Sequence, residues 1–224
     1  MKIKYLGHAS FLITTSSGTQ VLTDPYSTEA YAGKLLLKPI EELVDVVTVS
    51  HEHGDHGDPA TLVGLPGAPV IIRGNGKFLA GGVEILGVET FHDDSQGSQR
   101  GKNTVFVMSA DDLRVGHLGD LGHVLTADQA AEIGAVDVAL VPVGGFYTID
   151  ARQATKVVEQ LEARLVIPMH YSSEKCLFPI AGVDEFVAGK ANVVRAGTSE
   201  IDVTRNSLPA ERQVVVLDQA LWAS

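Results

Sequence analysis

A dense group of side chains able to bind metal ions follows one apolar run of the chain. The segment VVTVSHEHGDHGDP, residues 46–59, contains three histidines and two aspartates. His51 and His53 point the same way in an extended or tightly turned segment, so both imidazoles can reach one ion. Asp55 and His56 follow the next glycine and can face a neighbouring ion from the other side. A solvated turn would need only serine, asparagine or lysine, so this density of imidazoles favours a metal site.

The residue types indicate which metals suit the site. Imidazole and carboxylate together suit zinc, and iron and manganese are also acceptable. A structural zinc finger uses cysteines, whereas this chain contains only Cys176. A site rich in histidine and aspartate is typical of catalytic metal, where one coordination position stays open for water.

Other polar residues stand at the ends of predicted strands. His51, His92, Asp120, the GGFYT loop at 144–148 and His170 each come directly after an apolar run or at its end. Strand ends in layered α/β folds are where side chains from distant segments converge on one site. Each of two residues has a purely structural alternative when taken alone: Asp120 could serve to shape a turn, and His170 could be a buried, hydrogen-bonded histidine. Together they are expected to meet.

The elements that position these residues follow from hydrophobic periodicity and helix caps. Capping-box patterns, Thr126 with Gln129 and Asp150 with Gln153, predict helices at 126–134 and 150–165, and Asp58 begins a short helix ending at 65. The strands are expected within 2–25 around a turn at 14–19, and at 44–50, 69–73, 83–91, 103–109, 113–118, 136–145 and 165–170, with weaker ones at 192–197 and 212–218. The run 44–50 is apolar enough to be buried on both faces. Hairpins followed by strand–helix units indicate layered sheets with helices outside them.

Composition excludes several classes of protein. The 224 residues carry a formal net charge of −11 and no basic block, which argues against a nucleic-acid partner. No run approaches the roughly 20 apolar residues of a membrane span, and the first residues lack the pattern of a signal peptide. A single cysteine fits a reducing compartment. We therefore expect one domain spanning residues 1–224, located in the cytoplasm.

The motifs resemble one known family over essentially the whole chain. HEHGDH, residues 51–56, matches the H-x-H-x-D-H signature of the metallo-β-lactamase superfamily, and YLGHASFLI, LTDP, TFH, HLGD, VALVPVGG and VIPMHY follow the family's order. The chain looks most like the small branch of predicted metal-dependent hydrolases that includes lactonase-like members. The resemblance implies an α/β (α+β) fold, a four-layer αββα sandwich with a one- or two-metal site at its rim.

The resemblance also implies a ligand set. The first metal would be held by His51, His53 and His92, the second by Asp55, His56 and His170, and Asp120 would bridge the two ions. The cofactors would be two divalent ions, zinc first, with manganese or iron as alternatives. Asp55 and Asp120 would be the catalytic residues, because both lie near the water that attacks the substrate.

Four further residues near these motifs have open roles. His8 either supports the site or contacts substrate, or it is a buried histidine bonded to backbone. Asp24 matches a family aspartate that orients a ligand histidine. His117 and His123 flank Asp120 and are expected to support a ligand or lie at the surface rather than bind metal.

The segment SQGSQRGKN after His92 contains two cations. Arg100 and Lys102 could meet an anionic group there, but the sequence favours a solvated hairpin loop.

Two functions compete at this level. The first is a metal-dependent hydrolase that attacks a small, potentially anionic metabolite, such as a lactone, ester or phosphoester. The second is a non-catalytic metal-binding or regulatory protein that retains the site. An intact ligand set favours the enzyme. The expected partner is a small-molecule substrate, without nucleic acid or membrane, and assembly into a homo-oligomer stays open.

Overall fold

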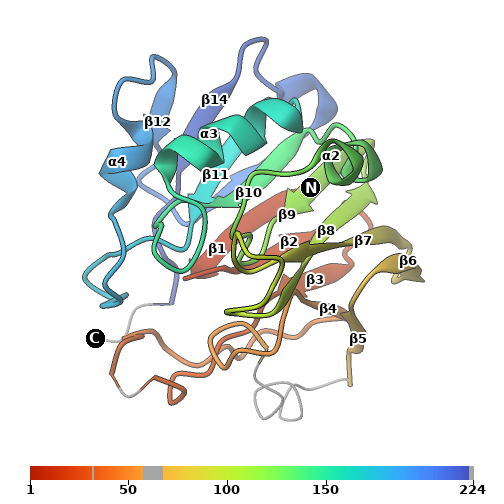
Figure 1. The fold of residues 1–224 in the computed structure, drawn as a ribbon. Helices are drawn as coiled ribbons and strands as arrows, with labels where there is room; N and C mark the ends of the chain where they lie inside the picture. The colour runs from red at the N-terminus through yellow and green to blue at the C-terminus, as the bar shows by residue number, and fades with distance from the viewer. Residues whose placement is uncertain (32, 58–67, 222–224) are drawn as a thin grey trace.

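Two sheets pack face to face in the computed structural model, which describes residues 1–31, 33–57 and 68–221 (Figure 1). The first sheet has six strands in the order β13-β1-β2-β3-β4-β5. The pairs β13–β1, β1–β2 and β2–β3 are antiparallel, whereas β3–β4 and β4–β5 are parallel. The bounds are β1 Lys2–Gly7, β2 Ser10–Thr14, β3 Gln20–Thr23, β4 Val46–Val49, β5 Val70–Arg73 and β13 Glu200–Asp202.

The second sheet has eight strands in the order β12-β14-β11-β10-β9-β8-β7-β6. Strands β6 to β9 form an antiparallel meander, and β9, β10, β11, β14 and β12 are parallel. The carboxyl ends of β9, β10 and β11 therefore meet at one edge. The bounds are β6 Gly76–Ala80, β7 Val83–Phe91, β8 Lys102–Ala110, β9 Leu113–His117, β10 Val138–Pro142, β11 Leu165–Met169, β12 Val193–Arg195 and β14 Gln213–Val216.

Helices cover the outer face of the eight-stranded sheet (Figure 1). Helix α2, Ala127–Ile133, packs on β7, α3, Ala151–Gln160, packs on β10, and α4, Val183–Val187, packs on β11. Both predicted capping boxes form at the starts of α2 and α3. A short 3-10 helix spans Arg205–Ser207. No helix in the described part of the chain is long and apolar enough to cross a membrane.

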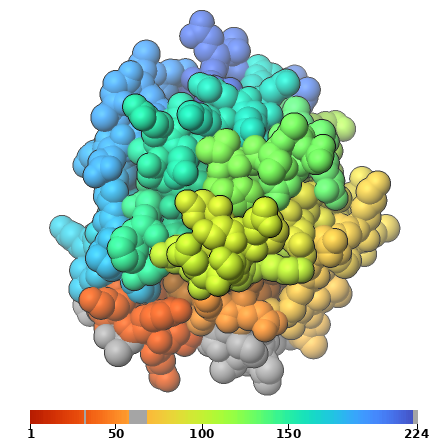
Figure 2. Space-filling model, in the orientation of Figure 1, coloured from red at the N-terminus to blue at the C-terminus, as the bar shows by residue number. Residues whose placement is uncertain are grey.

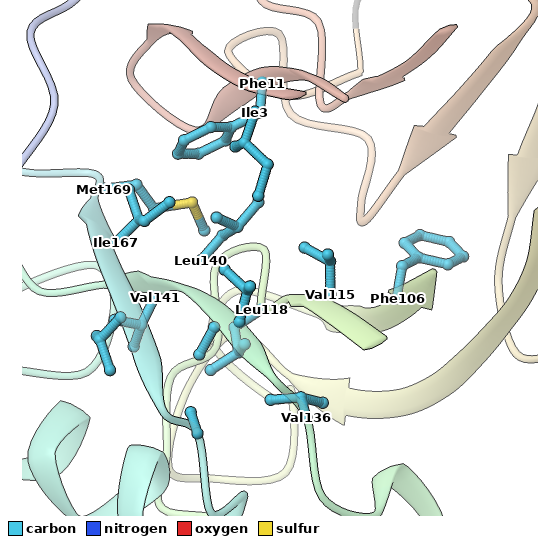
Figure 3. Close-up of a cluster of buried hydrophobic side chains, with 14 of the residues drawn as sticks. Ile3, Phe11, Phe106, Val115, Leu118, Val136, Leu140, Val141, Ile167 and Met169 are labelled. Carbon is cyan, nitrogen blue, oxygen red and sulfur yellow. The ribbon is translucent and has the colours of Figure 1, made fainter. Parts of the chain in front are cut away.

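The main core fills the space between the sheets. Figure 3 shows Ile3 and Phe11 of the first sheet directed toward Met169 and Leu140 of the second sheet, in one buried cluster. All four side chains are fully buried. Burying this interior supplies the main driving force for stacking the sheets.

A second apolar cluster covers the other face of the six-stranded sheet. Leu12, Leu22 and Val47 pack there against Leu35 and Leu37 of the irregular segment 24–45. Strand β4 is therefore buried on both faces, as its apolar run predicts. The helix expected at 58–65 lies outside the described residues. The two sheets and their covering layers confirm the α/β metallo-β-lactamase-like fold.

Four short elements were not expected from the sequence, one of them the 3-10 helix Arg205–Ser207. Strand β6 is an edge strand of GKFLA, in which Leu79 is 74% exposed, so it lacks the periodicity of a buried strand. Strand β13 has three residues and forms because it pairs with β1, which lies near the other end of the sequence. Helix α4 has five residues and no side-chain cap. The turn between β8 and β9 is a tight hairpin with positive φ at Asp111 and Asp112.

Candidate metal centre

All seven predicted ligands meet at the edge where the strands end. His51 follows β4, His92 follows β7, Asp120 lies just beyond β9 and His170 follows β11. The group contains His51, His53, Asp55, His56, His92, Asp120 and His170, of which only His53 is more than 9% exposed. The strand-end argument from the sequence therefore places these side chains correctly.

Asp120 lies at the centre of this group. Its Oδ2 is 3.2 Å from Nε2 of His92 and 3.7 Å from Nε2 of His51. Its Oδ1 is 3.1 Å from Nε2 of His56 and 3.3 Å from Nε2 of His170. Each carboxylate oxygen thus faces a different pair of histidines.

The potential ligand atoms fall into two neighbouring sets, and a third group, Asp24 with His51 and His56, overlaps both. His51, His53 and His92 offer atoms that all lie within 4.8 Å of one another. The second set, with the same spacing, consists of His8, Asp55, His56 and His170. Apart from His8, the two sets are the ones that the family resemblance implies for two metal ions.

Unsatisfied buried atoms indicate that the centre is built for a cation. Among the described residues, neither Nε2 of His56 nor Oδ1 of Asp120 has a hydrogen-bond partner of acceptable geometry, although both are buried. An isolated buried polar atom is costly, because it has lost its water without gaining a partner. Divalent ions bound among these nitrogen and oxygen atoms would satisfy them, so the donor set fits zinc, manganese or iron.

Asp24 fixes the orientation of two of the histidines. Its Oδ2 accepts a hydrogen bond from Nδ1 of His56 at 2.9 Å and another from Oγ of Ser50 at 2.5 Å. The Ser50 hydroxyl donates its only proton to Asp24. Its oxygen must therefore accept a hydrogen bond from Nδ1 of His51, 2.9 Å away. Both histidines therefore carry a proton on Nδ1, which leaves Nε2 of each ring as the atom that can bind metal: Nε2 of His51 lies 3.0 Å from Nδ1 of His53, and Nε2 of His56 lies 3.1 Å from Asp120.

His8 supports the second set of ligands. Its Nε2 donates to Oδ2 of Asp55 at 3.1 Å, and its Nδ1 lies 3.7 Å from Sγ of Cys176. The ring is 4.2 Å from the ring of His170, centroid to centroid. Of the two readings that the sequence left open, the structure favours contact with the site, because the imidazole bonds a carboxylate rather than backbone.

The two histidines that flank Asp120 lie outside both sets. Nε2 of His117 donates to the backbone oxygen of Ala9 at 2.8 Å. His123 accepts from the backbone N–H of Phe91 through Nε2 and donates to the oxygen of Val124 through Nδ1. Both bond backbone groups rather than the ligand cluster.

The backbone around the centre is held in demanding conformations. His8, Asp24 and His170 all have positive φ, between 40° and 54°, which is uncommon for residues with a side chain. Gly119 also has a positive φ, and a Cβ there would lie 2.4 Å from Oδ1 of Asn103. That same oxygen accepts from the backbone N–H of Asp120 at 2.9 Å. Strain of this kind clusters at functional sites, where the surrounding packing maintains it.

Burial and charge separate the protonation states of the histidines. Burial lowers the pKa of His51 to about 3 and that of His8 to about 4, so both rings are neutral at neutral pH. Burial acts the same way on His56, but the carboxylates of Asp120 and Asp55 outweigh it and raise its pKa well above the ordinary value. Burial opposes ionisation of Asp120, yet His170 and His56 hold its pKa well below the usual range.

The centre opens into a cavity of about 240 Å³. Its lining combines ligands with aromatic side chains and one cation: Tyr31, His53, Asp55, His92, Arg100, Asp120, Tyr147, His170 and Phe178. The segment after His92 is a largely exposed hairpin loop between β7 and β8, as the sequence favours, and within it Arg100 lines this cavity. Lys102 is exposed and pairs with Glu89 at 2.8 Å.

Three aromatic residues of the cavity were not identified from the sequence. Tyr147 belongs to the GGFYT loop, whose position after a strand was the available signal. Tyr31 and Phe178 lie in irregular segments, where no periodicity marks a side chain as inward-facing. Their rings lie 5.4 Å apart, centroid to centroid. Burial, together with the nearby carboxylates of Asp55 and Asp120, raises the pKa of Tyr31 to about 12.

Fold and site together define a metal-dependent hydrolase built on two stacked sheets, and comparison with known proteins agrees. The family model described as a beta-lactamase superfamily domain matches residues 2–170. A UPF0173 metal-dependent hydrolase of Pyrococcus horikoshii is 33% identical over 220 residues, covering 87% of this chain and 95% of the relative. The corresponding protein of Archaeoglobus fulgidus is 32% identical over 209 residues, covering 82% and 87%.

A solved structure shows the same similarity in three dimensions. A Thermotoga maritima protein assigned to the Zn-dependent hydrolases of the metallo-beta-lactamase superfamily is 37% identical to this chain. The two superimpose with a TM-score of 0.75, covering 96% of this chain and 97% of the other. The chain belongs to the metallo-β-lactamase superfamily, within its UPF0173 metal-dependent hydrolases.

Proposed function

We propose that this metal-dependent hydrolase holds two divalent ions, zinc or alternatively manganese or iron, and cleaves a lactone, ester or phosphoester in a small metabolite. The observation that carries the proposal is the position of Asp120, whose two oxygens face separate histidine pairs. The family assignment favours turnover over a purely regulatory role for the site.

The residues would divide as follows. His51, His53 and His92 would hold one ion, Asp55, His56 and His170 the other, and Asp120 would bridge them. Divalent ions in such a site lower the pKa of water and polarise the oxygen of the bond to be cleaved.

The chain's own groups prepare the reaction around these ions. Asp120 balances positive charge between the two ligand sets, and Asp24 keeps His56 and His51 in their metal-binding tautomers. Asp55, held by His8, lines the cavity and can accept a proton from the attacking water or pass one to the leaving group.

The cavity limits the size of the substrate. Typical ligand pockets measure about 300–1,000 Å³, so about 240 Å³ fits a small metabolite. Its wall includes the rings of Tyr31, Tyr147 and Phe178, which suit an apolar or planar group. A nucleic-acid strand would need a basic groove, and the net charge of −11 does not favour one.

Substitution of Asp120 tests the proposal. Asp120→Asn keeps the size of the side chain but removes the charge between the ligand sets, so one metal equivalent should be lost. Hydrolysis across a panel of lactones, thioesters and phosphodiesters should fall at least about 100-fold. His123→Ala is the matched control, because His123 bonds only backbone groups in the described structure. Elemental analysis showing full metal in Asp120→Asn, with undiminished hydrolysis, would contradict the assignment.

A further inference from the structure

One carboxylate organises the loop that follows His92. Oδ1 of Asp93 accepts from the backbone N–H groups of Ser95 and Gly97, and Oδ2 accepts from those of Gln99 and Arg100, at 2.7–3.0 Å. These four bonds hold the pKa of Asp93 at about 2 against the effect of burial. Residues 93–101 form the yellow-green surface at the centre of Figure 2. The loop is therefore a fixed support rather than a free hairpin end.

The loop 93–101 places the side chain of Arg100 in the wall of the cavity. The Arg100 guanidinium lies over the ring of Tyr147, 5.7 Å from its centroid, and Arg100 lines the cavity together with Asp120 and His170. Within the described residues, no carboxylate lies within 4 Å of the guanidinium, and no side-chain hydrogen bond satisfies it. Its five N–H groups are thus available to a ligand.

The carboxylates around Arg100 are engaged elsewhere. Of the 17 Lys and Arg residues, six pair with a described carboxylate within 4 Å: Lys2, Lys4, Arg73, Lys102, Arg195 and Arg205. Lys102, two residues further on, pairs with Glu89. The carboxylates that share the cavity with Arg100, Asp55 and Asp120, are instead engaged by histidines.

The surroundings favour a carboxylate over a phosphate dianion. A guanidinium binds planar carboxylates through two parallel hydrogen bonds. One cation balances one negative charge, and Arg100 is the one Lys or Arg side chain among the described cavity-lining residues. The remaining wall, with Tyr31, Tyr147 and Phe178, suits an apolar or aromatic body.

We propose that Arg100 forms a carboxylate-binding subsite, which selects small esters or lactones bearing one carboxylate on an apolar or aromatic body. The carboxylate would sit against the guanidinium while the scissile group faces Asp120. The choice of substrate class rests on the proposed hydrolase function, whereas binding of the anion does not.

Binding measurements test the subsite without any reaction. Calorimetric titration with benzoate and with benzamide, its neutral counterpart, compares the wild type, Arg100→Gln and Lys102→Gln, each with and without zinc. Benzoate should bind at least about tenfold more weakly to Arg100→Gln, the scale of one charge-assisted hydrogen bond. Lys102→Gln should match the wild type, and benzamide should bind all three proteins equally. Arg100→Gln should also melt like the wild type.

Equal benzoate affinity for the wild type and Arg100→Gln would overturn the subsite, as would undetectable binding of benzoate to the wild type. Hydrolysis gives a separate outcome. The wild type should prefer 4-acetoxybenzoate to its methyl ester, and Arg100→Gln should lose this preference mainly through KM. Arg100-dependent binding without hydrolysis of any ester, lactone or phosphoester would refute the proposed function and leave the subsite intact. Hydrolysis with no preference for the carboxylate would refute the subsite alone.

Discussion

Replacing Asp24 with asparagine should disturb both ligand sets at once. Asp24 is fully buried and accepts from the Ser50 backbone, the Ser50 hydroxyl and His56. An asparagine that keeps its oxygen toward the Ser50 backbone turns its NH₂ toward the hydroxyl and His56. Nδ1 of His56 must then accept, so the proton moves to Nε2, the atom that faces Asp120. The Ser50 hydroxyl no longer donates to Asp24 and can donate to Nδ1 of His51. The proton of His51 then moves to Nε2, so the tautomer of this histidine changes as well.

The size of the effect follows from these contacts. Loss of a hydrogen bond to a charged group costs about 1.5–3 kcal/mol. That loss corresponds to the roughly 10–100-fold fall in metal affinity found when a group that orients a ligand is removed. The metal-free protein should also lose about 1–3 kcal/mol of stability, which lowers the melting temperature by about 2–12 °C.

Zinc titration against a chromophoric chelator measures the affinity, and NMR of the imidazole nitrogens reports the tautomers. Ser50→Ala is the control, because it removes the contact to His51 and leaves the bond between Asp24 and His56. Asp24→Asn should therefore weaken metal binding more than Ser50→Ala. The reasoning is refuted if Asp24→Asn binds zinc like the wild type, or if His56 in that variant still carries its proton on Nδ1.

Three other perturbations probe the centre. A chelator should lower the melting temperature, since metal at a thousandfold excess over its Kd contributes about 4 kcal/mol to the free energy of unfolding. Added zinc or manganese should restore the melting temperature. Identical melting curves with and without chelator would argue against a bound metal. Gly119→Ala should destabilise the chain by about 1–3 kcal/mol in chemical denaturation, because its Cβ would lie 2.4 Å from a side-chain oxygen at a positive φ; a neutral effect would mean that the turn before Asp120 is not tightly packed. Finally, the pKa values of His51 and His8, about 3 and about 4 when folded, are below 6.5, the ordinary value. Their stabilising effect is therefore present above pH 6.5 and is lost as the pH falls toward 4, by up to about 1.4 kcal/mol per pH unit for each ring. Denaturation of the metal-free protein between pH 4.5 and 6.5 should show this slope, His51→Gln should reduce it, and an unchanged slope would contradict the assignment.

The sequence predicts those features that depend on residues close together in the chain. Capping pairs such as Thr126 with Gln129 form, because both partners lie within one turn. The run of β4 is buried on both faces, since its composition leaves no polar face. Alternation along β7 and the continuous apolar run of β8 likewise give their positions closely. The elements missed, β6 and β13, have weak local patterns and depend on a partner strand.

The same division holds for the site. Residue types and strand-end positions single out His51, His92, Asp120 and His170, whereas the full set of seven ligands is what the family resemblance implies and stays a prediction. Their binding of two ions stays a prediction, as do the single domain over 1–224, the cytoplasmic location and the oligomeric state.

Only the tertiary structure decides the contacts between distant segments. It shows which oxygen of Asp120 faces which histidines, and that Asp24 reaches His56 across 32 residues. It also separates Arg100, inside the cavity, from Lys102, paired at the surface, although both cations belong to one short loop. The physical reason is that hydrogen bonds and ion pairs act over a few ångströms of space. The sequence determines which groups are available, and the packing of the two sheets determines which of them meet.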